Sequence, residues 1–375
     1  MRISCTRLCA FVFGCAALTA ACNGNEPIPT DTGGAPNDTG GTSTGTGGAT
    51  TGSGGAASGG ANSGGTATGG TAAPSGGTAT GGTATGGKAT GGAAAGGASS
   101  GGQSAGGASS GCGVSGVASG VQNLQITVNG QVRTYVVSIP SNYSASTPQV
   151  LVFAFHGMGG SGTVARQYFN IEVSNGRGGY TNDRAIFVYP DGLANDGGST
   201  GWSFTTTSAD MAFFDALFAE VMTKYCINTN RVFVTGHSMG AMATNALGCY
   251  RGDLIRAIAP VAGMPPMSYG GGTVTCAGNV GAFIVHGNND TTVDFTQGGI
   301  ATRDFWIARN GCSTTTVPDS TTPSACVDYQ GCQPDLPVIW CVHTLGHNWP
   351  ATTSCDGGIC FNAGPAIWGF FASFQ

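Results

Sequence analysis

A serine flanked by glycines is the strongest candidate for chemistry in this sequence. A short β-prone run at 231–235 leads into the pentapeptide GHSMG, centred on Ser238, and then into a helix-prone stretch. A serine on such a strand-to-helix turn has a strained backbone, so its neighbours must be small, and its hydroxyl projects above the sheet. This setting predicts that Ser238 is a nucleophile for acyl transfer.

A nucleophilic serine needs a base, and the base needs a carboxylate to orient it. Downstream, Asp290 comes just beyond one apolar run and His347 beyond another. The chain order Ser, Asp, His is the one that α/β hydrolases use, so we predict a triad of Ser238, Asp290 and His347. Asp294 is the alternative acid, although it lies farther from the strand end. His343 is the alternative base, although it lies within or beside the strand.

An oxyanion hole requires two backbone N–H donors, and the residue after the nucleophile supplies one of them. Here that residue is Met239. The stretch FHGMGG at 155–160 ends an early apolar run in a glycine-rich turn, so Gly157 or Met158 is expected to supply the second donor. A phosphate-binding loop is the alternative, but the lysine and the acidic residue that such loops require are missing from the expected places.

These residues lie between apolar runs that alternate with amphipathic helical candidates. The runs are at 150–155, 185–189, 232–235, 255–260, 282–285 and 338–342, and the helical candidates are at 210–225, 239–250, 300–310 and 363–374. Short continuous runs suit buried parallel strands. Two alternating stretches, 124–128 and 132–137, are joined across Asn-Gly and predict a hairpin. We therefore expect an α/β-hydrolase fold: a mostly parallel sheet with helices on both faces, entered by an N-terminal β-hairpin.

Functional sites in such a sheet lie at the carboxyl ends of its strands. All five histidines end or follow predicted strands: His156, His237, His286, His343 and His347. His286 is expected to shape its own turn rather than to titrate during catalysis. The clustering indicates that one edge of the sheet carries the site.

The first 111 residues differ in composition from the rest. Residues 1–21 combine two arginines with an apolar run too short to span a bilayer, which predicts a signal peptide. Cys22 follows small residues and resembles the acylated cysteine of a bacterial lipobox. We expect lipidation there, with ordinary cleavage and a spare thiol as the alternative. Residues 22–111 are rich in Gly, Ala, Thr and Ser and predict a disordered tether, which leaves 112–375 as one α/β-hydrolase domain.

Charge and cysteine usage restrict the partners and the compartment. The net charge is −5 without any basic run, which argues against a nucleic-acid partner. Ten of the 14 cysteines lie in 112–375 and could form five disulfides in an oxidising compartment. Cys355 and Cys360 close the shortest loop and are predicted to pair, whereas the other pairings stay open. The spacing offers no zinc site. We expect an exported monomer, at a bacterial cell surface or outer membrane or else secreted.

A set of segments resembles the secreted carbohydrate-esterase group of α/β hydrolases, which includes feruloyl and acetylxylan esterases and the related polyhydroxybutyrate depolymerases. The segments are FHGMGG, YPDGL followed by GWSF, GHSMGAMA, APVAG, VHGNNDTTV and GHNWP, and they cover the predicted domain. The resemblance implies the same nucleophile, acid and base, and no metal or cofactor. It also implies that Trp202 borders the acyl pocket, with a buried core tryptophan as the alternative. Trp349 is assigned to the same pocket. Ala241 departs from the pattern, because many members have a second glycine there.

The expected function is that of an extracellular serine esterase that hydrolyses feruloyl or acetyl esters on plant cell-wall polysaccharide through an acyl-enzyme. Its substrate would be polymeric or insoluble, and it would touch a membrane only through the lipid anchor. A polyhydroxyalkanoate depolymerase shares every catalytic residue and is the alternative. A non-catalytic surface-binding lipoprotein is the alternative of another class, although such a protein would have no need of a complete triad.

Overall fold

The computed structural model describes residues 107–375, apart from 173–180, 182, 195–197, 204, 268–273, 323 and 356. The predicted signal peptide, Cys22 and most of the predicted tether therefore lie outside the described residues. The chain divides into two units, Met1–Thr90 and Gly91–Gln375, and the description below concerns the second. In the described part of this unit, no helix is both long and apolar enough to cross a membrane.

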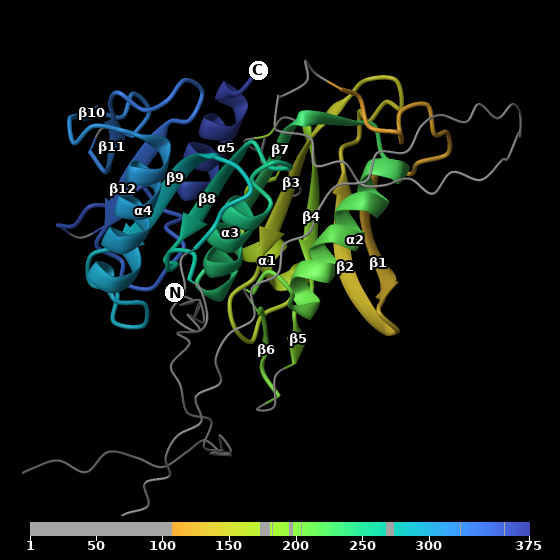
Figure 1. The fold of residues 1–375 in the computed structure, drawn as a ribbon, viewed down its shortest axis with the longest axis horizontal. Coiled ribbons are helices and arrows are strands. Elements are labelled where there is room, and N and C mark those ends of the chain that lie inside the picture. Colours follow the sequence, from red (N-terminus) through yellow and green to blue (C-terminus); the bar gives the residue numbers. More distant parts are fainter. Residues whose placement is uncertain are drawn as a thin grey trace, which may run out of the picture. The chain divides into compact units, whose positions relative to one another are not determined.

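A ten-stranded sheet forms the centre of this unit, with the strand order β1-β2-β4-β3-β7-β8-β9-β12-β11-β10 (Figure 1). The strands are β1 (Gly120–Val128), β2 (Gln131–Ile139), β3 (Gln149–Phe155), β4 (Ala185–Pro190), β7 (Ile227–His237), β8 (Ala257–Val261), β9 (Gly281–Gly287), β10 (Thr316–Pro318), β11 (Cys326–Tyr329) and β12 (Val338–His343). The six strands from β4 to β12 in this order pair in parallel, and antiparallel strands extend both edges. This is the α/β-hydrolase architecture predicted from the sequence.

The first two strands form an antiparallel hairpin. Val128 pairs with Gln131, and the two residues between them, Asn129 and Gly130, both have positive φ, 52° and 81°. Such angles are what a two-residue hairpin turn requires, and Asn-Gly adopts them at low cost. The pairing of β1 with β2 at this edge of the sheet is thus determined by the residues of the turn between them.

Helices cover both faces of the sheet. They are α1 (Gly162–Phe169), α2 (Ala209–Lys224), α3 (Met239–Tyr250), α4 (Ala301–Asn310) and α5 (Ala363–Ser373), with a π-helical turn at Phe295–Ile300. Residues of α2, α3 and α4 pack into one hydrophobic core, and residues of α1 and α5 pack into a second. Alternate residues of β3 enter opposite cores, Phe153 the first and Val152 the second. The two cores are therefore separated by the sheet, as the period-two pattern of a strand requires.

Five disulfides join the ten cysteines of the described region. The pairs are Cys112–Cys226, Cys249–Cys276, Cys312–Cys332, Cys326–Cys341 and Cys355–Cys360. The predicted pairing of Cys355 with Cys360 is confirmed. The other four pairs have sequence separations of 15 to 114 residues and depend on how the strands and loops fold, which is why spacing left them open.

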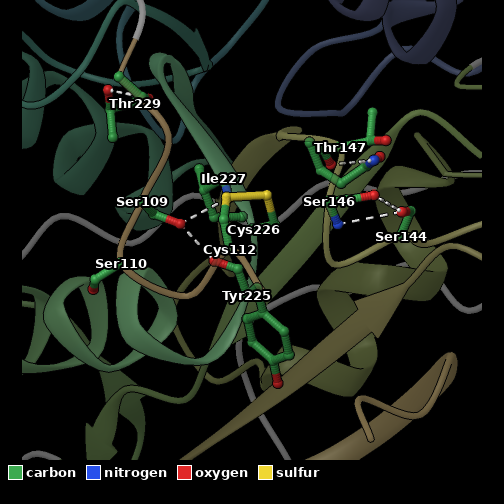
Figure 2. Close-up of a disulfide and its surroundings, with 12 residues drawn as sticks. Ser109, Ser110, Cys112, Ser144, Ser146, Thr147, Tyr225, Cys226, Ile227 and Thr229 are labelled. Carbon is green, nitrogen blue, oxygen red and sulfur yellow. Dashed lines mark hydrogen bonds between the residues drawn. A yellow bond between two sulfur atoms is a disulfide. The ribbon is translucent and has the colours of Figure 1, made fainter. Parts of the chain in front are cut away.

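The domain begins earlier than composition predicted. Ser109, in the predicted tether, lies buried beside the start of β7 (Figure 2). Its hydroxyl donates to the Tyr225 carbonyl at 2.6 Å and accepts from the Ile227 N–H at 2.9 Å. Gly111 packs so closely that a Cβ there would lie 2.4 Å from the Tyr225 oxygen. The boundary at residue 111 is thus corrected to before Ser109, because backbone hydrogen bonds rather than apolar side chains order this segment.

Ser109→Ala should lower the free energy of unfolding by about 1–3 kcal/mol, because it leaves a buried N–H and a buried carbonyl without their partner. The neighbouring Ser110 is exposed, and its hydroxyl lies 3.3 Å from the Met222 carbonyl. Ser110→Ala is therefore the matched control and should stay within about 0.5 kcal/mol of wild type. Denaturant unfolding measures both. Equal stabilities for the two variants would show that the Ser109 contacts do not stabilise the domain.

Candidate active site

Ser238 occupies the turn between β7 and α3, and its backbone is strained. Its φ and ψ are 58° and −122°, a conformation that residues with a side chain rarely adopt. The surrounding structure maintains this conformation: the Ser238 N–H donates to the Val261 carbonyl at 2.9 Å, and its own carbonyl accepts from Ala241 N–H at 2.9 Å. The residue with the strained backbone is therefore the serine that the sequence predicts as the nucleophile.

The glycines of the pentapeptide are required by close backbone approach. A Cβ on Gly240 would lie 2.0 Å from the Phe155 carbonyl oxygen, and a Cβ on Gly236 would lie 2.5 Å from the Gly240 oxygen. These contacts hold the start of α3 against the end of β3. The turn that presents Ser238 is thus packed directly against the strand that leads to the glycine-rich turn at 156–160.

A continuous row of hydrogen bonds joins Ser238, His347 and Asp290. His347 Nε2 lies 2.9 Å from Ser238 Oγ, and His347 Nδ1 lies 2.7 Å from Asp290 Oδ2. An ionised carboxylate can only accept, so Nδ1 carries the proton and Nε2 is left to accept from the serine hydroxyl. The structure thus brings together the three residues predicted from widely separated segments, in the geometry of a nucleophile, a base and an orienting acid.

Asp290 is held as a carboxylate. Its Oδ1 accepts from the N–H groups of Thr292 and Val293, both at 2.9 Å. Burial alone would raise its pKa, but the hydrogen bonds from His347 and from these backbone groups outweigh burial and keep the pKa below its ordinary value. The alternative acid, Asp294, is exposed and instead accepts from the N–H groups of Thr296 and Gln297. The structure therefore places Asp290, and not Asp294, against His347.

The alternative base is enclosed. His343 ends β12 with its side chain fully buried, and its Nδ1 accepts from the Leu345 N–H at 3.2 Å. His286 donates through Nε2 to the Val293 carbonyl at 2.9 Å, and the same nitrogen lies 3.4 Å from Asp290 Oδ2. His286 thus supports the loop that carries Asp290, in line with the expectation that it shapes its own turn.

The glycine-rich turn lies against the nucleophile. A Cβ on Gly157 would lie 3.3 Å from Ser238 Cβ, so this turn borders the serine. The N–H of Met239, at the first position of α3, has no partner within the helix. The predicted donors, the N–H groups of Met239 and of Gly157 or Met158, thus belong to segments beside Ser238, and their role in an oxyanion hole stays a prediction.

The side chain of His156 fixes the direction of this turn. Its Nδ1 lies 2.7 Å from the Gly157 carbonyl oxygen, and its Nε2 accepts from the Gly192 N–H at 2.9 Å. The Trp202 indole N–H donates to the His156 carbonyl at 2.8 Å. In a trans peptide the N–H points away from the C=O of the preceding residue. The bound His156 carbonyl therefore fixes the direction of the Gly157 N–H, and the bound Gly157 carbonyl fixes that of the Met158 N–H. Sequence reasoning missed this role of His156.

The two tryptophans assigned to the acyl pocket are interior residues. Trp202 is 6% exposed and packs on Phe155 and His156. Trp349 is 3% exposed and stacks on Phe169 with ring centroids 4.3 Å apart. The burial of Trp202 agrees with the alternative of a core tryptophan, and its indole supports the glycine-rich turn. The assignment of both tryptophans to the acyl pocket stays a prediction. Trp349 anchors the loop that carries His347.

Tyr168 on α1 was also missed. Its hydroxyl accepts the backbone N–H of Trp349 at 2.9 Å, two residues after the base, and its ring meets the His237 ring edge-on at 5.5 Å. The local signals for α1 are its two ends: the Ser161 hydroxyl accepts from the Val164 N–H as an N-cap, and Asn170 ends the helix in the left-handed conformation. A helix of eight residues gives too little periodicity to reveal which side chain faces the site.

Four of the five histidines should titrate below the ordinary histidine pKa of about 6.5. Burial lowers the pKa of His237 to about 3, with His347 nearby adding to the effect, and burial lowers that of His343 to about 4. Burial also lowers the pKa of His156 and of His286.

Because unfolding would let these four rings take up protons, stability should fall as the pH drops from about 6.5 toward 4 and 3. Imidazole NMR of the folded protein is expected to show these four signals unchanged above pH 7. Where the protein stays folded at low pH, the titration midpoints of His343 and His237 should lie near 4 and 3. A midpoint above 6.5 for any of the four would contradict the burial argument.

Comparison with known proteins finds esterases. Feruloyl esterase D of Neurospora crassa is 33% identical over 240 residues, which cover 60% of this chain and 78% of the relative. A probable feruloyl esterase C of Aspergillus terreus is 32% identical over 234 residues, which cover 62% of this chain and 80% of the relative. No protein-family model matches. Among solved structures, the acetyl xylan esterase from Aspergillus awamori gives a TM-score of 0.49 at 17% identity, covering 67% of this chain and 99% of that one.

Proposed function

Because the chain belongs to the feruloyl esterase family, we propose that it hydrolyses feruloyl or acetyl esters on plant cell-wall polysaccharide. The chain is a carboxylic-ester hydrolase. The observation that carries the catalytic assignment is the row of hydrogen bonds from Ser238 through His347 to Asp290. The substrate class is supported by the names of the relatives, feruloyl esterases C and D.

The geometry supports a two-step acyl transfer. Ser238 Oγ attacks the ester carbonyl carbon while His347 Nε2 takes its proton, and the carbonyl oxygen becomes an oxyanion that accepts from the N–H groups of Met239 and the glycine-rich turn. The C–O bond to the alcohol then breaks, and His347 returns the proton to the departing oxygen. Water repeats the sequence on the acyl-enzyme and releases the acid. Asp290 stabilises the imidazolium in both steps.

Substrate assays test the proposal. Purified protein is expected to release ferulate from methyl ferulate or acetate from acetylated xylan, and to leave short-chain polyhydroxybutyrate intact. Hydrolysis of the polyester alone would favour the depolymerase alternative. No hydrolysis of any of the three, nor of a p-nitrophenyl ester of a short acyl chain, would leave only a surface-binding role.

The chain is an exported protein, because five disulfides form and persist in oxidising compartments. We propose further that it is a monomer held at a cell surface through acylation of Cys22, since that cysteine follows small residues at the end of an apolar run. Metabolic labelling with a clickable palmitate analogue in a bacterial host should mark the protein, and Cys22→Ser should abolish the label. Unlabelled soluble protein beginning near Ala21 would show ordinary secretion instead.

A further inference from the structure

The position of His347 identifies the side of the site that the alcohol half of an ester must occupy. In the mechanism above, His347 Nε2 returns a proton to the departing alcohol oxygen, so that oxygen must come within hydrogen-bond reach of Nε2. The acyl oxygen is held instead by the N–H groups of Met239 and the glycine-rich turn. The group attached to the alcohol oxygen therefore lies along the flank of His347.

Tyr168 lies near that flank, on the far side of His237. The His347 and His237 rings have centroids 4.9 Å apart, and the Tyr168 ring follows at 5.5 Å from His237. The Tyr168 hydroxyl is bound to the Trp349 N–H in the loop that carries His347, which fixes the ring in place. Tyr168 is thus a fixed aromatic wall beside His237, next to the loop that carries the base.

This wall is exposed. Tyr168 retains 42% of its accessible surface, although its hydroxyl is bound and one edge is packed. Val164, one helical turn earlier on the same face of α1, is 53% exposed. The intervening arginine, Arg166, pairs with Glu172 and leaves this stretch without a free charge. Because the Tyr168 hydroxyl already accepts a hydrogen bond, the exposed part of the ring would contact a ligand through van der Waals packing.

We propose that Tyr168 is a specificity residue that packs against the sugar ring carrying the ester. This inference rests on the proposed function, which makes the alcohol half of the substrate a sugar of a polysaccharide. The faces of a sugar ring present C–H groups, and these pack favourably on the electron-rich face of an aromatic ring. A methyl ester of the same acid has no group that reaches Tyr168. The chain should therefore prefer a sugar ester to the methyl ester of the same acid, and Tyr168 should supply that preference.

The test compares two substrates with one acyl group, methyl ferulate and a feruloyl ester of arabinose. The measured quantity is the ratio of kcat/KM for the sugar ester to kcat/KM for the methyl ester. Tyr168→Leu removes the ring and should lower this ratio by about three- to tenfold, the range expected for one aromatic contact. Tyr168→Phe removes the hydroxyl only, so any change in rate through the His347 loop should affect both substrates alike and leave the ratio unchanged. Tyr329→Leu, at a half-buried tyrosine of β11, is the control and should leave the ratio at the wild-type value.

The outcomes separate the inference from the function on which it rests. A wild-type ratio above one that falls in Tyr168→Leu alone supports the sugar contact. An unchanged ratio in a folded Tyr168→Leu that still hydrolyses methyl ferulate overturns the sugar contact and leaves the esterase function standing. A second series uses p-nitrophenyl ferulate and p-nitrophenyl acetate, which share the alcohol. A change confined to this pair would place Tyr168 on the acyl side and overturn the inference. Failure of the wild type on every ester would overturn both.

Discussion

Ser238→Ala should reduce kcat/KM for ester hydrolysis by roughly 10⁴-fold or more. The structure gives the reason: Ser238 Oγ is the atom that His347 Nε2 contacts, and without it no acyl-enzyme can form. The oxyanion donors and the substrate contacts survive the change, so a small residual rate above water should remain. Steady-state kinetics with a p-nitrophenyl ester measures the loss.

The control must show that the loss is chemical. Alanine keeps the backbone hydrogen bonds of residue 238. The melting temperature of Ser238→Ala should therefore stay close to that of wild type, and its circular dichroism spectrum should be unchanged. Ser373, exposed near the end of α5, offers a matched serine whose hydroxyl bonds only its own helix. Ser373→Ala should retain activity within about twofold. A Ser238→Ala variant with activity within about tenfold of wild type would remove Ser238 from the mechanism.

The sequence was most informative where chemistry is encoded locally. Ser238 lies in a pentapeptide whose glycines are required by contacts with the Phe155 and Gly240 carbonyls, so the pattern itself reports the strained turn. Asp290 and His347 follow strands that apolar runs reveal, and parallel strands bring their carboxyl ends to one edge. The triad could therefore be assembled from three segments without knowledge of their contacts.

The residues that support the triad could not be found in this way. His156 acts through both ring nitrogens, on Gly157 and on Gly192, and the second contact depends on how the chain returns after β4. Tyr168 lies on a helix too short to show a period, and its partner, Trp349, is 181 residues away. The sequence likewise does not show that Trp202 and Trp349 are buried, because an aromatic residue near a motif can pack inward or outward, and only tertiary contacts decide.

Composition also misjudged the start of the domain. A segment of small residues cannot bury enough apolar surface to offset its ordering entropy, which is why composition predicts a tether over residues 22–111. Ser109 escapes this argument because it forms two buried hydrogen bonds with the backbone next to Cys226, and Cys112 is bonded to that cysteine. The disulfide keeps the segment near its partners, so ordering it costs less entropy than composition implies.

Asp290→Asn should lower kcat by about 10³- to 10⁴-fold without unfolding the domain. In the wild type, Asp290 Oδ1 accepts from two backbone N–H groups, which an asparagine oxygen can still do, while Oδ2 binds His347 Nδ1. An amide nitrogen in place of Oδ2 would face the Nδ1 proton, donor against donor. The ring would then favour the tautomer with its proton on Nε2, which cannot accept a proton from Ser238.

Asp294 supplies a control with nearly the same local structure. Its Oδ1 also accepts from the backbone N–H groups two and three residues on, at 2.9 and 2.8 Å, but the described structure gives it no contact with His347. Asp294→Asn should therefore reproduce any cost of changing a turn carboxylate and leave kcat within about threefold, since neutral substitution keeps its turn bonds. Because the two variants differ chiefly in the lost contact to His347, the ratio of their kcat values measures how much the orientation of the base contributes. A severe defect in Asp294→Asn beside a near-normal Asp290→Asn would transfer the acid role to Asp294, and the nucleophile and base would remain as assigned.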